Sequence, residues 1–241
     1  MEQEISSKLD ELRKLLPENR EFRVWLSESN LWSWLYSGFR IQGQAVSKSA
    51  VVDMYNGVIR EDVPLSNYSF VQKYRALYLD MQTELSMRSA PDIKLFRRWL
   101  DMLYEGVVYR KNNPVVFEFG LIPCHFSSIE EELEKAFRAF VQSDKDPVEA
   151  SAMLFLDIVK IYPFEEESID AAMTVLLYCL EGFGFPIPEL SVNEEEFGNL
   201  MRAYMDKGNA EPFCSMLERS VYNRLDAVIM LAKHTKENEE N

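Results

Sequence analysis

The chain has 241 residues, of which 47% are hydrophobic, and its formal net charge is −14. A chain of this size can bury one substantial core, and nothing in its composition resembles a linker, so we expect one domain over residues 1–241. The acidic excess argues against binding nucleic acid or an anionic membrane surface, because phosphate contacts need clustered lysine and arginine.

The cysteines and the N-terminal residues bear on the compartment. Cys124, Cys179 and Cys214 have neither paired nor metal-type spacing, which favours reduced thiols. No apolar run approaches the length of a membrane span, and the start MEQEISSKLD is too polar for a secretory signal. We therefore expect a cytoplasmic protein, while delivery elsewhere by a dedicated secretion system stays open.

Residues from about 20 to 110 are expected to form the N-terminal helices. Apolar spacing predicts a first short helix that Pro17 ends, and a second helix from near Glu21. That second helix carries an aromatic patch, for which core packing and contact with a second copy of the chain both stay open. The same spacing predicts further helices at about 48–58, 67–85 and 93–104.

The period changes in the stretch VVYRKNNPVVFEFGLIP, residues 107–123. It is rich in Val, Phe and Tyr and is interrupted by KNNP, which predicts a β-hairpin. A strand here would have one strongly apolar face, either packed on the core or offered to a partner. Its candidate binding residues are Val115, Val116, Phe117, Glu118 and Phe119.

Core helices are expected over residues 127–231, followed by a polar tail at 232–241. Capping-box spacing, with Ser127 before Glu130 and Ser191 before Glu194, predicts the starts of two of these helices.

Between those two starts lies the most apolar part of the chain. Residues 150–164 have apolar side chains on nearly every side, which predicts a central helix that buries Phe155, Ile158 and Val159. Pro163 cannot continue that helix. An acidic run then precedes a second apolar helix from about 168 to 181.

The junction between these two apolar helices resembles the motif of the Fic (Fido-fold) family, H-x-F-x-[D/E]-G-N-G-R-x-x-R. Pro163, Phe164 and Glu166 match it. A later segment resembles the family's Y, then G-D, then P-F-I-x-F-L sequence, so the resemblance spans roughly residues 20–225; its residues are Tyr204, Gly208, Asn209, Pro212, Phe213 and Leu217. The other motif positions differ: Tyr162 replaces the histidine, Glu167, Ser168 and Ile169 replace G-N-G, Asp170 replaces the first arginine and Met173 the second.

A second segment resembles the family's inhibitory sequence, [S/T]-x-x-x-E-[G/N]. Gly38 stands at the Ser/Thr position, Gln42 at the glutamate and Gly43 at the last position. In the family that glutamate pairs with the second motif arginine, whose place Met173 takes here. Both halves of the ion pair are therefore absent together, which suggests that no nucleotide remains to be blocked.

The resemblance implies a mainly α protein, a Fic-like helical bundle around a central buried helix with one short β-hairpin as its flap. It also implies transfer of AMP, or another phosphate-containing group, to a target hydroxyl. In the family a histidine is the base, an acidic residue holds Mg²⁺, and the glycine-rich turn with arginine forms an anion hole.

The replaced residues argue against that reaction here. A phenol such as that of Tyr162 has a reference pKa near 10, so about one in a thousand is ionised at pH 7. Carboxylates at residues 165–167 and at Asp170 would repel a polyphosphate. We therefore expect the transfer to be lost.

Two classes of function remain. The first is a non-catalytic Fic-like protein without a cofactor, which binds a partner protein or a second copy of itself through the flap. The alternative is a transferase or hydrolase with a remodelled site, in which Glu166 holds Mg²⁺ and an ATP-like nucleotide is bound. Titration with Mg²⁺ and ATP, GTP or a CDP derivative separates them.

Overall fold

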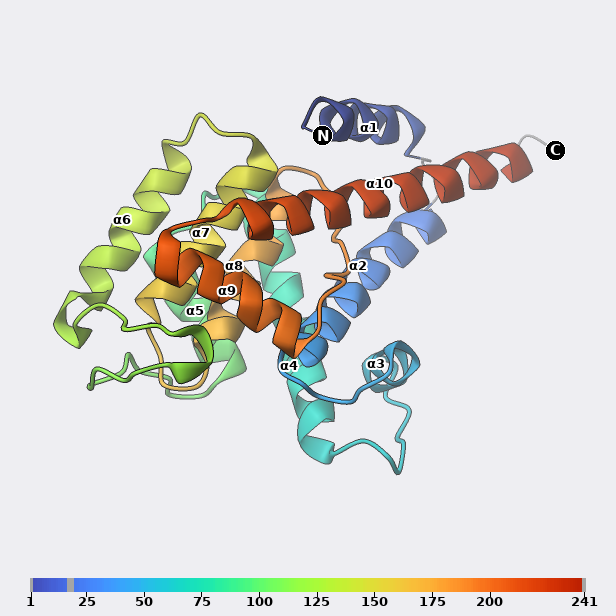
Figure 1. The fold of residues 1–241 in the computed structure, drawn as a ribbon. Helices are drawn as coiled ribbons and strands as arrows, with labels where there is room; N and C mark the ends of the chain where they lie inside the picture. Colours follow the sequence, from blue (N-terminus) through green and yellow to red (C-terminus); the bar gives the residue numbers. More distant parts are fainter. Residues whose placement is uncertain (1, 17–19, 240–241) are drawn as a thin grey trace.

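A computed structural model describes residues 2–16 and 20–239, except for the side chains of residues 118, 238 and 239. The described residues form ten α-helices and two short 3₁₀ turns, η1 (Phe117–Phe119) and η2 (Phe126–Ser128) (Figure 1). The predicted mainly α class is confirmed. The helices are α1 (Glu2–Leu15), α2 (Arg20–Ile41), α3 (Lys48–Tyr55), α4 (Leu65–Ser86), α5 (Ile93–Leu103), α6 (Ile129–Val141), α7 (Pro147–Ile161), α8 (Ser168–Gly182), α9 (Glu194–Lys207) and α10 (Glu211–Glu239).

The core is built around α7, which packs against α8. Helix α7 starts where the Asp146 carboxylate accepts a hydrogen bond from the Val148 amide over 2.9 Å, with proline at the first helical position. Phe155, Ile158 and Val159 are fully buried, which confirms the predicted central helix.

Aromatic contacts fix α9 and α10 on this central helix. The ring of Phe155 stacks on Phe213 of α10 with centroids 4.7 Å apart, and it meets Phe197 of α9 edge-on at 6.2 Å. Such ring pairs each add about 0.5–1.5 kcal/mol beyond their buried area. The start of α9 is thereby held beside the middle of α7.

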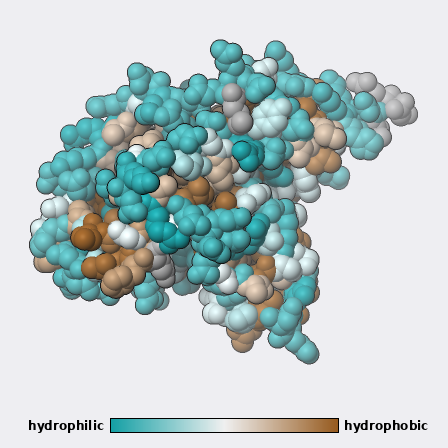
Figure 2. Space-filling view, in the orientation of Figure 1, coloured by the Kyte–Doolittle hydropathy of each residue, from teal (hydrophilic) through white to brown (hydrophobic). Residues whose placement is uncertain are grey.

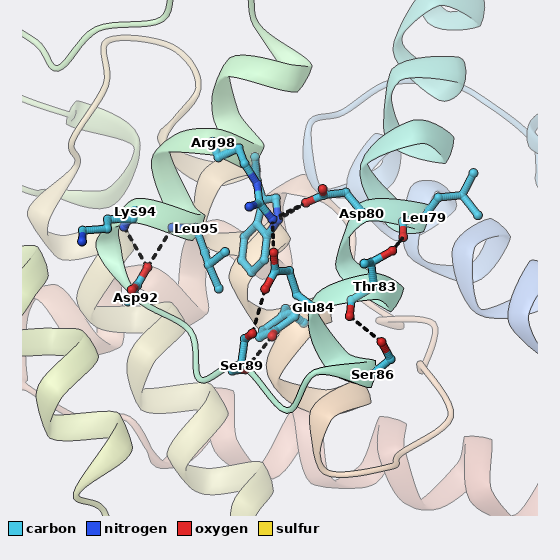
Figure 3. Close-up of polar contacts among 12 residues, drawn as sticks. Leu79, Asp80, Thr83, Glu84, Ser86, Ser89, Asp92, Lys94, Leu95 and Arg98 are labelled. Atoms are coloured by element: carbon cyan, nitrogen blue, oxygen red, sulfur yellow. Dashed lines mark hydrogen bonds and ion pairs between the residues drawn. The ribbon is translucent and has the colours of Figure 1, made fainter.

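An ionic cluster joins α4 to α5 (Figure 3). The Nη2 atom of Arg98 donates to a carboxylate oxygen of Asp80 and to one of Glu84, each over 2.6 Å. The second Glu84 oxygen accepts from the Ser89 hydroxyl over 2.7 Å. This cluster positions α5, which leads directly into residues 107–123.

The described part of the polar tail predicted at 232–241 belongs to helix α10 instead of following it. Helix α10 runs to Glu239, and Ala232 is fully buried. Helix α1 lies along this part of α10 (Figure 1), and Glu11 and Lys233 form an ion pair at 2.8 Å. Packing against α1 therefore extends the helix. Pro17, the predicted end of the first helix, lies outside the described residues.

Both predicted capping boxes are also wrong. The box of α9 is formed two residues later, by Asn193 and Glu196, which exchange side-chain to backbone hydrogen bonds of 2.9 Å. At α6, Ser128 precedes the helix without a side-chain cap, because the 3₁₀ turn η2 comes first. In neither case did the spacing identify the residue that adopts the cap geometry.

Residues 107–123, called the flap loop from here on, do not form the predicted hairpin of two strands. Among the described residues, their pairing is limited to one antiparallel bridge, in which Val116 and Leu121 exchange backbone hydrogen bonds of 2.9 and 3.1 Å. The turn η1 fills the space between these two residues, and Gly120 closes it with a φ of 63°. The backbone amide of Arg110 instead donates to the Pro163 carbonyl, so the first half of the loop pairs with the α7–α8 turn.

No described helix is both long and apolar enough to cross a membrane.

Candidate functional site

A cavity of about 520 Å³ lies where the α7–α8 turn, the flap loop and the start of α9 meet. It brings together the three segments that the sequence singled out, namely the motif, the inhibitory segment and the flap. Its lining residues are Ile41, Gln42, Phe119, Tyr162, Glu166, Ile169, Asp170, Glu194, Glu195, Phe197, Gly198 and Arg202.

Tyr162 ends α7 and lies half-buried in the cavity wall. Its backbone is left-handed, with a φ of 50°, and its amide still donates to the Ile158 carbonyl over 3.0 Å. Pro163 and Phe164, which follow it, are buried. The motif residues that match the family therefore anchor the turn, and the tyrosine takes the place at which the family has its base.

Arg110 supports this turn from the flap loop. Only 3% of its surface is exposed. Its guanidinium donates mainly to backbone carbonyls, and it also makes longer contacts with the Asn113 side chain and the Cys124 sulfur. The carbonyl bonds run to Tyr162 (2.7 Å), Ile161 (3.1 Å), Cys124 (2.5 Å) and Asn112 (2.6 Å). A cation at a helix C-terminus also meets the negative end of the helix dipole. Burial lowers the pKa of Arg110 below its usual value.

Asp170, in the first turn of α8, is the most constrained carboxylate of the cavity. Its Oδ1 atom accepts a hydrogen bond from Nε2 of Gln42 over 2.6 Å, and its Oδ2 atom accepts one from the Tyr104 hydroxyl. Burial raises the pKa of Asp170, and these two hydrogen bonds offset part of the rise. The position of the family's first arginine thus carries a carboxylate that the inhibitory segment contacts directly.

The inhibitory segment is held on both sides. Gln42 accepts from the Gln44 side chain over 3.3 Å, and Gln44 accepts from Asn67 of α4 over 3.4 Å. Gly43 has a φ of 70°, and a Cβ atom there would lie 2.1 Å from a carboxylate oxygen of Glu194. The exposed Glu194 side chain could move aside, so it is the left-handed φ that favours glycine at this point. Gly38 lies within α2 and does not line the cavity.

The remaining motif positions divide between the turn and the core. Ser168 is buried, and its hydroxyl bonds to both the amide and the carbonyl of Phe164, at 2.9 and 2.8 Å. Glu167 precedes α8 without a side-chain cap, and Ile169 lines the cavity. Met173, at the second arginine position, is 2% exposed and belongs to the core.

Carboxylates dominate the charge of the cavity. Its lining includes Glu166, Asp170, Glu194 and Glu195, against the guanidinium of Arg202, which donates to Asn199 over 2.7 Å. Within the described part of the chain, no group of three or more His, Cys, Asp or Glu side chains is arranged to hold a metal ion.

The flap loop has an inner and an outer side, and they do not follow the predicted alternation. Phe119 is buried, with its ring edge-on to Phe197 of α9 at 6.1 Å, whereas Phe117 is 87% exposed. Val115 is exposed and Val116 is buried, as alternation would place them, so the departure lies at Phe117 and Phe119, where η1 replaces the predicted strand. The side chain of Glu118 lies outside the described part. We name the exposed apolar side chains Val115, Phe117, Ile122 and Phe126 the flap patch.

Sequence reasoning missed several residues that build the site. The supports Arg110 and Tyr104 and the acids Glu194 and Glu195 lie far along the chain from the motif, and Glu194 stands out only for its capping-box spacing with Ser191. The only available signal was the pair Tyr109-Arg110, which resembles part of the family's flap.

Comparison with known proteins identifies the fold. No protein-family model and no curated protein matches the sequence. Among solved structures, a Fic domain containing signaling protein from Bacteroides thetaiotaomicron is similar, with a TM-score of 0.79, 14% identity, and coverage of 96% of this chain and 98% of that one. Fic-1 from C. elegans has a TM-score of 0.72 and 15% identity, with coverage of 97% and 73%. A Fic family protein from Desulfovibrio desulfuricans has a TM-score of 0.68 and 12% identity, with coverage of 95% and 74%.

The chain therefore has the Fic fold, as the motif resemblance predicted.

Proposed function

We propose that this chain is a Fic-fold protein that has lost nucleotidyl transfer and acts by binding another protein through the flap patch. The observation that carries the proposal is the pair of hydrogen bonds from Gln42 and Tyr104 to Asp170. They hold a carboxylate on the cavity wall at the position where an arginine would stabilise phosphate.

The cavity residues do not fit a nucleotide with its Mg²⁺. At about 5 Å and an effective dielectric constant near 20, each carboxylate to phosphate charge pair costs on the order of 3 kcal/mol. A metal ion at Glu166 would offset part of that cost but would not replace the arginine and glycines of an anion hole. At position 162 a phenol replaces the family's imidazole, and a phenol with its reference pKa near 10 is almost entirely protonated at pH 7 and so is not a ready base.

The flap patch supports protein binding. Its members are large apolar side chains on the segment between α5 and α6, and the patch lies at the lower left of Figure 2, over the part of the chain that precedes α6. The loop is held by the Val116–Leu121 bridge, by Phe119 and by Arg110. An apolar patch on a fixed loop is typical of an interaction site, because little order has to be gained on binding. A second copy of the chain remains a candidate partner.

A binding experiment tests this proposal. Proteins that co-precipitate with the wild-type chain are compared with those captured by Phe117→Ser and by a matched control, Ile59→Ser. Ile59 is similarly exposed, at 76%, on the loop between α3 and α4. We expect Phe117→Ser alone to lose the partner. Retention of every partner by Phe117→Ser would contradict the proposal, and labelling of a protein from radiolabelled ATP would favour the enzyme alternative.

A further inference from the structure

The flap patch and the acidic cavity border the same short turn. Phe117 points outward and is 87% exposed, while Phe119, two residues later, lines the cavity. Because a 3₁₀ turn has about three residues per turn, these side chains leave the backbone in different directions. A partner seated on Phe117 therefore lies next to the cavity mouth.

The carboxylates of the cavity differ in what they already bind. Both Asp170 oxygens accept hydrogen bonds from Gln42 and Tyr104. Glu166, Glu194 and Glu195 are exposed and line the same space. These three, rather than Asp170, are the groups that can meet a charge brought in by a partner.

The rest of the wall is mixed. Ile41, Phe119 and Ile169 contribute apolar surface beside the three glutamates, and Gln42, Tyr162 and Arg202 contribute polar groups. A space with apolar walls and carboxylates suits the side chain of lysine or arginine, whose apolar stem packs on hydrocarbon while its cationic head stays with the acids. The lining sets four carboxylates against the guanidinium of Arg202, so an anionic or purely apolar group would leave the acidic excess without a counter-charge.

We infer that the partner segment carries a lysine or arginine close to an apolar anchor. The anchor packs on the flap patch and the cation enters the cavity, where it meets Glu166, Glu194 and Glu195. This inference rests on the proposed function and names the chemistry of its partner. Charge complementarity carries it, since the chain has a net charge of −14 and its flap patch borders the acidic cavity.

A displayed library of random peptides, selected on the intact chain, provides the probe. Selected peptides are synthesised and titrated against four variants by fluorescence anisotropy. Phe117→Ser tests the anchor, with Ile59→Ser as its control. The triple variant Glu166→Gln, Glu194→Gln, Glu195→Gln tests the cavity. Its control is Glu61→Gln, Glu105→Gln, Glu134→Gln, which changes the same charge at exposed positions that do not line the cavity.

We expect the selected peptides to carry a lysine or arginine near a large apolar residue. Phe117→Ser should weaken their binding by about tenfold or more, as loss of an aromatic anchor does. The cavity variant should weaken it by about five- to tenfold, and both controls should stay within about twofold. Replacing the peptide's cation with glutamine should weaken binding to the wild type but not further to the cavity variant, because the two changes remove one interaction.

The outcomes separate the two claims. If no selected peptide depends on Phe117, the proposed function fails and the inference fails with it. If binding depends on Phe117 but the peptides lack a cation, or the cavity variant binds as the wild type does, only the inference is overturned.

Discussion

The side-chain amide of Gln42 donates a hydrogen bond of 2.6 Å to Oδ1 of Asp170, which joins the loop after α2 to the first turn of α8. The two residues lie 128 positions apart in the chain. An amide fits here because it can donate to the carboxylate, which a glutamate at position 42 could do only when protonated.

Gln42→Glu should therefore destabilise the protein. It would place a second carboxylate against Asp170, and we expect a loss of about 1–3 kcal/mol in the free energy of unfolding at pH 7. Chemical denaturation measures the change, with Gln3→Glu on the exposed face of α1 as a control of equal charge. Equal stability of the two variants would show that the Gln42–Asp170 contact contributes nothing.

Restoring the family histidine alone should not restore transfer. In Tyr162→His, Asp170 still occupies the arginine position and Glu167 still precedes α8. We expect no incorporation of label from radiolabelled ATP, into the chain itself or into an added protein. Labelling by the single variant would show that the acidic residues hinder the nucleotide far less than argued.

Arg110→Ala should cost about 2–4 kcal/mol in the free energy of unfolding. Four backbone carbonyls would lose a charged donor, and lysine cannot replace the planar arrangement of guanidinium donors. Arg110→Lys should therefore rescue little of the loss. Lys94→Ala, which removes an exposed cation from α5, should stay within about 0.5 kcal/mol of the wild type. A similarly small effect of Arg110→Ala would show that Arg110 does not hold the motif turn.

The free energy of unfolding should fall as pH rises past the pKa of Glu181, which lies at the end of α8. Burial raises the pKa of Glu181 to about 7, although Tyr78, Asn30 and Gln82 donate hydrogen bonds to it. Because the folded state holds this proton more tightly than the unfolded chain, the stabilisation is full below about pH 4.5. It is then lost as pH rises through 7.

The expected size of this effect is about 3 kcal/mol between pH 4.5 and pH 8. Chemical denaturation of the wild type and of Glu181→Gln is carried out at a series of pH values. The difference between their free energies of unfolding at each pH isolates the contribution of Glu181 from that of other groups. The exposed control Glu134→Gln should retain the wild-type profile. A difference curve that is flat with pH would contradict the assignment.

The spacing of apolar residues and the motif positions predicted the central helix and part of the cavity. Phe155, Ile158 and Val159 lie on a helix that is apolar all round, so its central place could be read from the sequence. The motif positions likewise placed Tyr162, Glu166 and Asp170 on one cavity.

Contacts between distant segments account for the failures. The flap loop has strand-like composition, but Arg110 pairs with the motif turn and Phe119 packs on α9, so the hairpin is reduced to one bridge. The end of α10 is polar in sequence, yet it stays helical and forms an ion pair with α1 between Lys233 and Glu11. Asp170 and Gln42 could both be singled out in advance, but not their contact with each other or with Tyr104, since hydrogen bonding across the bundle leaves no periodic signal.

One measurement tests the central claim most directly, namely calorimetric titration of the wild-type chain with ATP and Mg²⁺. The account predicts no binding up to millimolar nucleotide, with or without the metal, because carboxylates occupy the place of the anion hole. Saturable, Mg²⁺-dependent binding that Glu166→Gln abolishes would contradict it and would favour a remodelled transferase or hydrolase.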